Sequence, residues 1–134
     1  MSVFVDSSVW IDVFNPKAKT PEKELLIRLI GNDYPVYICP IVYQEVLQGI
    51  RDDKTFEKIK HIFGSFRMIN IDLLDVTNHA IDLYRSLRKK GITIRKTVDC
   101  LIASYAILTG MQLLHSDDDF TKIAQGSKLK IYKV

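Results

Sequence analysis

Short runs of β-branched and aromatic residues alternate with amphipathic segments along the whole chain. The short runs predict strands, and apolar residues spaced three or four positions apart predict helices. The predicted strands are Val3–Val5, Tyr34–Cys39, Met68–Ile71, Gln112–Leu114 and Lys130–Tyr132. The predicted helices are Ser8–Phe14, Pro21–Ile30, Ile41–Ile50, Lys54–Phe63, Leu73–Lys90, Val98–Leu108 and Phe120–Ala124.

This alternation predicts an α/β fold of three layers, α/β/α, with a mostly parallel central sheet and helices on both faces. Parallel strands need crossover connections, and the segments between these strands are long enough to supply them. The helix Val98–Leu108 is apolar nearly all round, so we expect it to be buried, with Thr97 as its N-cap. No linker, repeat or low-complexity stretch divides the chain, which predicts a single domain over residues 1–134.

The composition is that of an ordinary globular protein, with 47% apolar and 26% charged residues. The longest apolar run, Val36–Tyr43, is broken by Pro40 and is much shorter than the ~18 residues that a membrane helix needs. The start, Met1–Asp6, lacks the basic region of a signal peptide. Cys39 and Cys100 have no zinc-site spacing and read as buried thiols. We therefore expect a cytoplasmic protein that does not enter a membrane.

The net charge of +3 is unevenly distributed along the chain. Residues 1–84 carry 9 basic and 12 acidic side chains, whereas residues 85–134 carry 10 basic and 4 acidic ones. A mildly basic total is compatible with a nucleic-acid partner but does not by itself indicate one. The positions of the acidic residues are more informative.

Four acidic residues fall where predicted strands end or where the following helices begin. Asp6 ends the first strand, and Asp117 follows the strand Gln112–Leu114. Glu45 lies early in the helix after the second strand, and Asp99 opens the buried helix. Ligands of open parallel sheets bind beyond the carboxyl ends of the strands, so these side chains are expected to converge there.

Each of these residues also has a structural interpretation. Asp6 and Asp117 could cap the helices that follow them, and Glu45 could be a solvated residue on a helix surface. Asp99 is harder to explain in this way, because it is the only charged residue of an otherwise apolar helix. A buried carboxylate is costly unless a cation or hydrogen-bond donors meet it.

If the four carboxylates converge, a divalent cation would balance their charge. Like charges a few ångströms apart raise one another's pKa, and a cation removes that conflict. Oxygen ligands without His or Cys select Mg²⁺ or Mn²⁺ rather than Zn²⁺. One or two such ions lower the pKa of a bound water and stabilise a leaving oxygen. The pattern therefore predicts a metal-dependent hydrolase that acts on phosphodiester bonds.

The chain resembles PIN-domain ribonucleases, and most closely the toxin subunits of VapBC toxin–antitoxin pairs. Four stretches carry the resemblance: Val3–Asp12 (VFVDSSVWID), Ile41–Gly49 (IVYQEVLQG), Thr97–Tyr105 (TVDCLIASY) and Leu113–Phe120 (LLHSDDDF). Each motif alone is weak, whereas all four in this order and spacing are specific. The resemblance covers essentially the whole chain and implies a PIN-like version of the α/β/α fold.

The resemblance implies an endoribonuclease that hydrolyses phosphodiester bonds of single-stranded RNA and leaves a 5′-phosphate and a 3′-hydroxyl. The acidic quartet around Mg²⁺ or Mn²⁺ would be Asp6, Glu45, Asp99 and Asp117. Asp119 would be a secondary acidic ligand, and Ser7 would orient the first carboxylate. The resemblance also implies a homodimer that is neutralised by a cognate antitoxin of VapB type.

One position departs from the family pattern. Two residues before the fourth aspartate, where relatives carry Thr or Ser, this chain has His115, followed by Ser116. His115 could hydrogen-bond a phosphate or titrate near neutral pH, or Ser116 could take over the supporting role. A histidine that only packs is the structural alternative.

Two further groups of residues bear on the partners. Arg95 and Lys96 precede the helix that carries Asp99, and we expect one of them to contact RNA phosphate at the rim of the site. Such contacts would make RNA binding fall with rising salt concentration. Trp10 and Phe14 are expected in the core, although a groove for an antitoxin segment is the alternative.

Two other functions stay open for the same fold. The chain could be a PIN nuclease of RNA processing without an antitoxin, or an inactive PIN-like module that binds RNA or protein. The intact acidic quartet argues against the inactive module. A receiver domain is excluded because no acidic pair follows the first strand, and a dehalogenase-type phosphatase because Ser8 stands where a second aspartate is needed.

Overall fold

The computed structural model describes residues 1–134 as five strands and seven helices. The strands are β1 (Val3–Val5), β2 (Val36–Ile38), β3 (Arg67–Met68), β4 (Gln112–Leu114) and β5 (Lys130–Ile131). The helices are α1 (Ser7–Val13), α2 (Pro21–Gly31), α3 (Pro40–Gln48), α4 (Asp53–Phe63), α5 (Leu73–Lys89), α6 (Thr97–Thr109) and α7 (Asp118–Gln125).

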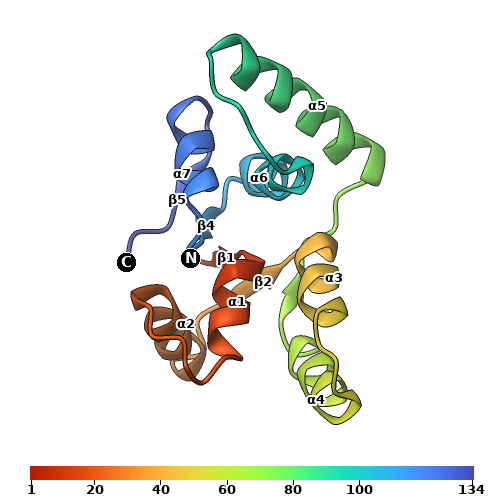
Figure 1. The fold of residues 1–134 in the computed structure, drawn as a ribbon, viewed down its shortest axis with the longest axis vertical. Helices are drawn as coiled ribbons and strands as arrows, with labels where there is room; N and C mark the ends of the chain where they lie inside the picture. Colours follow the sequence, from red (N-terminus) through yellow and green to blue (C-terminus); the bar gives the residue numbers. More distant parts are fainter.

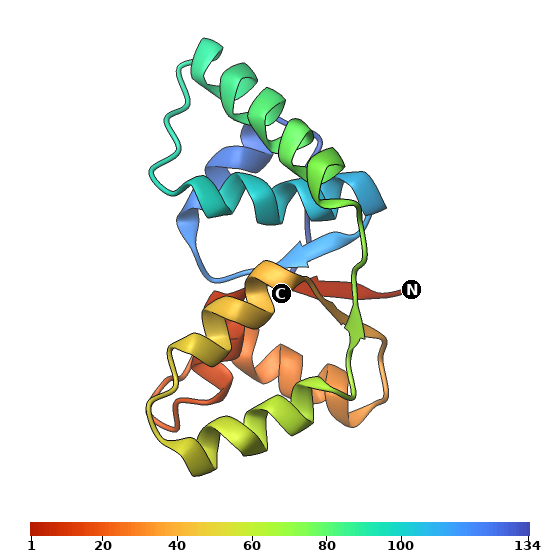
Figure 2. The ribbon, with the colours of Figure 1, turned by 90° about the vertical axis from the view of Figure 1, so that its right-hand side faces the viewer.

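The strands form one parallel sheet in the order β3-β2-β1-β4-β5. β1 is central, with Val3 opposite Val36 of β2 and Phe4 opposite Leu113 of β4. In Figures 1 and 2, α5, α6 and α7 lie together on one side of the strands and α1 to α4 on the other. The predicted α/β fold with a parallel sheet between helices is therefore confirmed.

Several predicted boundaries are wrong by a few residues. The third strand is displaced toward the N-terminus, because Arg67 and Met68 pair with β2, and the chain leaves the sheet after the Ile69 amide donates to the Ile38 carbonyl (2.8 Å). Thr97 is not the N-cap of α6; Lys96 occupies that position and makes no side-chain capping bond. α7 begins two residues earlier than predicted, because Asp117 caps it through the Asp119 amide.

The core lies between the sheet and its helices and is built on the three central strands. β1 is fully buried, and α6 is buried along most of its length, as its apolar sequence predicts. Cys39 and Cys100 are buried free thiols. Trp10 is buried in an aromatic cluster, with ring centroids 5.0 Å from those of Phe63 and Phe66, which confirms the core interpretation.

The helices bear on the expectation that the protein does not enter a membrane. None of the seven helices is long and apolar enough to cross a membrane.

Candidate functional site

The central strand, β1, is the switch point of the sheet, where the direction in which strands are added reverses. From β1 the chain builds the sheet outward through β2 and β3, and then returns to the other side of β1 to add β4 and β5. In such a sheet the loops after the two strands at the switch point diverge and leave space for a ligand beyond their carboxyl ends. Asp6 follows β1 directly, and Asp117 lies three residues after β4. The predicted edge of the sheet therefore carries the acidic residues.

Three aspartates from two elements form the tightest group at this edge. Asp99 in the first turn of α6 and Asp117 and Asp119 around the start of α7 each offer a carboxylate oxygen, and these oxygens lie within 4.8 Å of one another. Asp99 and Asp119 are buried, and Asp117 is half-buried. The structure thus includes Asp119, expected to be secondary, in the closest group, whereas Asp6 and Glu45 lie outside it. We call Asp99, Asp117 and Asp119 the aspartate triad.

One oxygen of the triad lacks a hydrogen-bond partner. Asp99 Oδ2 is buried, and no donor of the chain meets it. An unsatisfied buried polar atom is rare in a folded protein, and a charged one is especially costly. The donor set of the triad is all oxygen, which suits a hard divalent cation. The residues present therefore fit a Mg²⁺ or Mn²⁺ ion in chemistry and spacing.

Asp6 is held by Ser8, a residue that the sequence analysis did not assign to the site. Asp6 Oδ2 accepts hydrogen bonds from the Ser8 amide (3.0 Å) and the Ser8 hydroxyl (2.6 Å), and Asp6 is also the N-cap of α1. The Ser116 amide donates to the Ser8 hydroxyl oxygen (3.1 Å), so Ser8 links the ends of β1 and β4. An aspartate two residues before a serine is a common turn signal, which could have identified this contact.

The Ser7 hydroxyl meets a different carboxylate from the expected one. The Ser7 hydroxyl donates to Glu45 Oε1 (3.0 Å) and not to Asp6, because Ser7 begins α1 and its side chain reaches toward α3. Glu45 is thereby held at the border of the site with its other oxygen, Oε2, free of this contact. Ser7 supports a carboxylate as expected, but that carboxylate is the one from α3.

Arg95 and Lys96 both contact the triad, and both side chains are largely exposed. Lys96 Nζ is 3.0 Å from Asp117 Oδ2 and 3.9 Å from Asp99 Oδ2. Arg95 Nη2 lies 3.3 Å from both carboxylate oxygens of Asp119. The adjacent Arg95–Lys96 pair therefore brings a positive charge within 4 Å of every member of the triad. Contact with RNA phosphate stays a prediction.

The carboxyl groups differ in their proton affinity. Burial raises the pKa of Asp99 to about 7, with the Lys96 charge opposing it and the neighbouring carboxylates adding to it. Burial also raises the pKa values of Asp6 and Glu45. Burial alone would raise the pKa of Asp117, but hydrogen bonds from the Asp119 amide and Lys96 outweigh it and hold that pKa below its ordinary value. Asp117 is thus ionised at neutral pH, whereas Asp99 titrates there.

His115 and Ser116 support the loop before α7. His115 Nδ1 accepts a hydrogen bond from the Asp117 amide (3.2 Å), and the imidazole packs against Phe120. Burial lowers the pKa of His115, which favours the neutral ring that this contact requires. The Ser116 hydroxyl donates to Asp12 Oδ2 (3.4 Å) on α1. These contacts give His115 a structural role in positioning Asp117; contact with phosphate stays a prediction.

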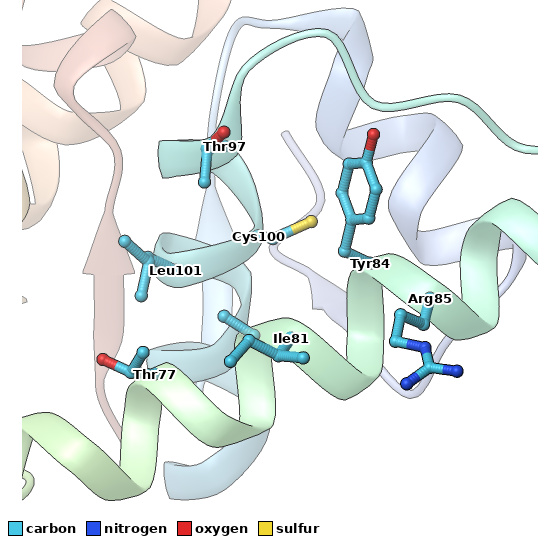
Figure 3. A pocket seen from close by; sticks show the side chains of 8 residues that line it. Thr77, Ile81, Tyr84, Arg85, Thr97, Cys100 and Leu101 are labelled. Carbon is cyan, nitrogen blue, oxygen red and sulfur yellow. The ribbon is translucent and has the colours of Figure 1, made fainter.

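A concave surface lies away from the triad, between α5 and α6, and is mostly apolar. In Figure 3, Cys100 on α6 points toward Tyr84 on α5, and Ile81 and Leu101 lie along the same hollow. No carboxylate lines it, and its polar groups are two threonine hydroxyls, the Arg85 guanidinium, the Tyr84 hydroxyl and the Cys100 thiol. It offers hydrophobic contact rather than acid–base or metal chemistry, so the acidic edge of the sheet is the candidate active site.

Comparison with known proteins identifies the family of the chain. Ribonuclease VapC11 of Mycobacterium tuberculosis is 29% identical over 128 residues, covering 96% of each chain. VapBC2 of Rickettsia felis, solved bound to a DNA fragment from its promoter, has a TM-score of 0.76 at 18% identity and covers 98% of both chains. A toxin–antitoxin complex from Klebsiella pneumoniae has a TM-score of 0.67 at 21% identity, covering 88% of this chain and 89% of that one. The model of the PIN domain family matches residues 3–126, so this chain belongs to the PIN domain family.

Proposed function

We propose that this chain is a metal-dependent endoribonuclease that acts as the toxin of a type II toxin–antitoxin pair. The observation that carries the proposal is the aspartate triad beside the switch point of a parallel sheet. Within the triad, the buried Asp99 Oδ2 has no hydrogen-bond donor from the protein. Membership of the PIN family and the likeness to a protein named a ribonuclease support RNA as the substrate. The proposed place of action is the cytoplasm.

The proposed cofactor is Mg²⁺ or Mn²⁺, held by the triad. Such an ion supplies a water of lowered pKa and stabilises the oxygen that leaves the scissile phosphate. Asp117 would hold the ion as a carboxylate, and a bound cation would favour the ionised form of Asp99. Asp119 would complete the set from the first turn of α7.

Asp6 and Glu45 would act beside the triad. Ser8 fixes the orientation of the Asp6 carboxylate with two hydrogen bonds. Ser7 donates to Glu45 Oε1 and fixes this carboxylate, which would take a proton from the attacking water. The raised pKa of Glu45, caused by burial, improves it as a base near neutral pH.

The proposed partner is an antitoxin of VapB type. Support comes from the likeness to VapC11 over nearly the whole chain and from the fold shared with a toxin–antitoxin complex. Expression of this chain alone should arrest growth, and coexpression with its antitoxin should restore it. Growth without arrest, by a protein that cleaves RNA when purified, would instead indicate an RNA-processing nuclease.

Cleavage of RNA by the purified chain tests the proposed activity. Wild type should cut single-stranded RNA with Mn²⁺ or Mg²⁺, leave 5′-phosphate ends and stop when EDTA is added. Asp99→Asn should lose at least a hundredfold in rate because the triad loses a ligand. Asp118→Asn is the matched control, since Asp118 is exposed and lies between two members of the triad. A folded wild type that is silent with both metals, or an Asp99→Asn variant that cuts equally well, would refute the activity.

A further inference from the structure

The Lys96 ammonium lies beside two carboxylates of the aspartate triad. It lies 3.0 Å from Asp117 Oδ2 and 3.9 Å from Asp99 Oδ2, close to two of the residues proposed to hold the metal ion. We propose that Lys96 is a resident counter-cation of the triad, which must swing out before a divalent ion can bind and which therefore lowers the affinity of the site for metal. The inference rests on the proposed function only in taking the triad as the metal site.

The position of Lys96 in α6 is unfavourable for the helix itself. Lys96 is the N-cap residue, where Ser, Thr, Asp or Asn is preferred and where the helix dipole repels a positive charge. Its side chain makes no capping hydrogen bond. Thr97, a better cap, lies one residue further on and is not used as one. The attraction between Lys96 and the carboxylates offsets this unfavourable position at the helix N-terminus. The contact with the triad is therefore the main interaction of the Lys96 side chain.

Of the three carboxylates of the triad, that of Asp99 lies farthest from its nearest cation. Its Oδ2 atom is buried without a hydrogen bond, and Lys96 is the cation nearest to it. A distance of 3.9 Å is too long for a hydrogen bond but keeps the Coulomb attraction. Lys96 thus gives partial compensation, which a divalent ion in direct contact with the oxygen would exceed.

Lys96 is also able to leave. About half of its side chain is exposed (53%), and its contact to Asp117 is at the half-buried edge of the triad. Lysine has a flexible stem with a compact charge, so the ammonium can move into solvent without moving the backbone. Arg95 reinforces the arrangement at Asp119, but its side chain is still more exposed (74%). The displacement of Lys96 is therefore the step that opens the triad.

Mn²⁺ binding to the full chain tests this inference without RNA. Lys96→Met keeps the length of the side chain and removes its charge, and we expect it to tighten the dissociation constant for Mn²⁺ about tenfold. Lys122→Met is the matched control, because it removes the same charge from an exposed position on α7. The dissociation constants are measured by electron paramagnetic resonance of free Mn²⁺, at constant pH and ionic strength.

Thermal unfolding gives a second readout. In EDTA, Lys96→Met should melt a few degrees below wild type, because Asp99 loses its nearest cation. With saturating Mn²⁺ the difference should vanish, because Lys96 has already been displaced in wild type.

Two results would overturn the inference. One is a dissociation constant for Lys96→Met that is unchanged from Lys122→Met, and the other is weaker Mn²⁺ binding by Lys96→Met than by wild type. The proposed function fails separately, when wild type binds Mn²⁺ and does not cleave RNA; tightened binding in Lys96→Met would still support the role of Lys96.

Discussion

Asp99 is the residue on which the electrostatics of the site depend most. Its carboxyl group is buried, and its pKa is raised to about 7 because burial and nearby carboxylates outweigh the attraction of Lys96. A carboxyl whose pKa is raised by folding favours the folded state at low pH. That contribution is lost as the pH rises toward 7, because ionisation is then easier in the unfolded chain. Without metal, Asp99 should therefore destabilise the protein above neutral pH.

The substitution Asp99→Asn tests this at two pH values. In EDTA at pH 8 the variant should be more stable than wild type by about 1–3 kcal/mol, since each pKa unit corresponds to about 1.4 kcal/mol and solvent screening reduces the total. At pH 5 the difference should be smaller, because Asp99 is then protonated in the folded wild type and ionised only in the unfolded chain, and it should vanish below the ordinary pKa of 3.8. Calorimetric melting curves measure both. A clear loss of stability at pH 8 would make Asp99 a structural residue.

The two adjacent serines at the start of α1 should differ in what they support. Ser8 donates to Asp6 and accepts from the Ser116 amide, so Ser8→Ala should lower the free energy of unfolding by about 1–2 kcal/mol. Ser7 contacts only Glu45 through its hydroxyl, so Ser7→Ala should slow RNA cleavage several-fold with little change in stability. Urea unfolding in EDTA and cleavage rates separate the two effects. Equal losses of stability would contradict this division.

At the scale of whole elements, α6 matters because it delivers Asp99 to the site. Its first turn carries Asp99 and its body is buried against the sheet and α5. The helix ends at Gly110, whose φ of +71° lies in the left-handed region that favours glycine. The position of β4, which begins two residues later, depends on this turn.

Alanine substitution of Gly110 tests the role of that turn. A Cβ atom at Gly110 would meet no atom within 4 Å, so any loss comes from backbone conformation alone. Gly110→Ala should lower the free energy of unfolding by about 1 kcal/mol. Gly31→Ala is the control, because Gly31 also has open space but is the last residue of α2 and has no positive φ, and it should be neutral or slightly stabilising. Urea unfolding that ranks the two variants in the opposite order would contradict this.

Hydrophobic periodicity predicts the order of the elements and the edge of the sheet at which Asp6 and Asp117 lie. Asp6 and Asp117 could be placed because each follows a short apolar strand, and Asp99 because it interrupts an apolar helix. The β3 boundary was missed because Ile69 and Ile71 extend its apolar run, and only pairing with β2 defines where the strand ends. The length of β3 is thus set by its pairing with β2 and not by its own sequence.

The contacts inside the site were less predictable. Ser7 and Ser8 are identical in type and adjacent, so only the direction in which α1 leaves β1 decides which one meets Asp6 and which meets Glu45. Lys96 was placed at the rim by its proximity to Asp99 in sequence. Its contact with Asp117 joins residues 21 positions apart and required the fold.

At the scale of the whole molecule, the small net charge conceals two opposite regions. Without Asp6, Glu45, Asp99 and Asp117, the rest of the chain carries +7. Metal bound at the acidic edge would therefore leave a basic body around the site. Arg85 and Lys89 of α5 and Lys90, which caps it, line a polar hollow on that body together with Asp82 and Ser86.

This charge distribution predicts that RNA binding depends on salt. The affinity of the cleavage-deficient Asp99→Asn variant for single-stranded RNA should fall linearly on a plot of log affinity against log salt, with a slope of roughly −0.7 for each phosphate contacted. Adding Lys96→Met should reduce the slope by about one contact if the displaced ammonium meets phosphate, as the sequence predicted. Fluorescence anisotropy at several salt concentrations measures both slopes. An affinity independent of salt would contradict a basic RNA-binding surface.

The central claim is that the ion held by Asp99, Asp117 and Asp119 is the ion that supports RNA cleavage. Mn²⁺ binding and cleavage rate, titrated with Mn²⁺ on the same wild-type, Asp117→Asn and Asp118→Asn proteins, test it most directly. We predict that wild type and Asp118→Asn bind and cleave with matching half-saturation, and that Asp117→Asn loses both at least tenfold. Cleavage by Asp117→Asn at the wild-type rate, or Mn²⁺ binding unchanged in that variant, would contradict the claim.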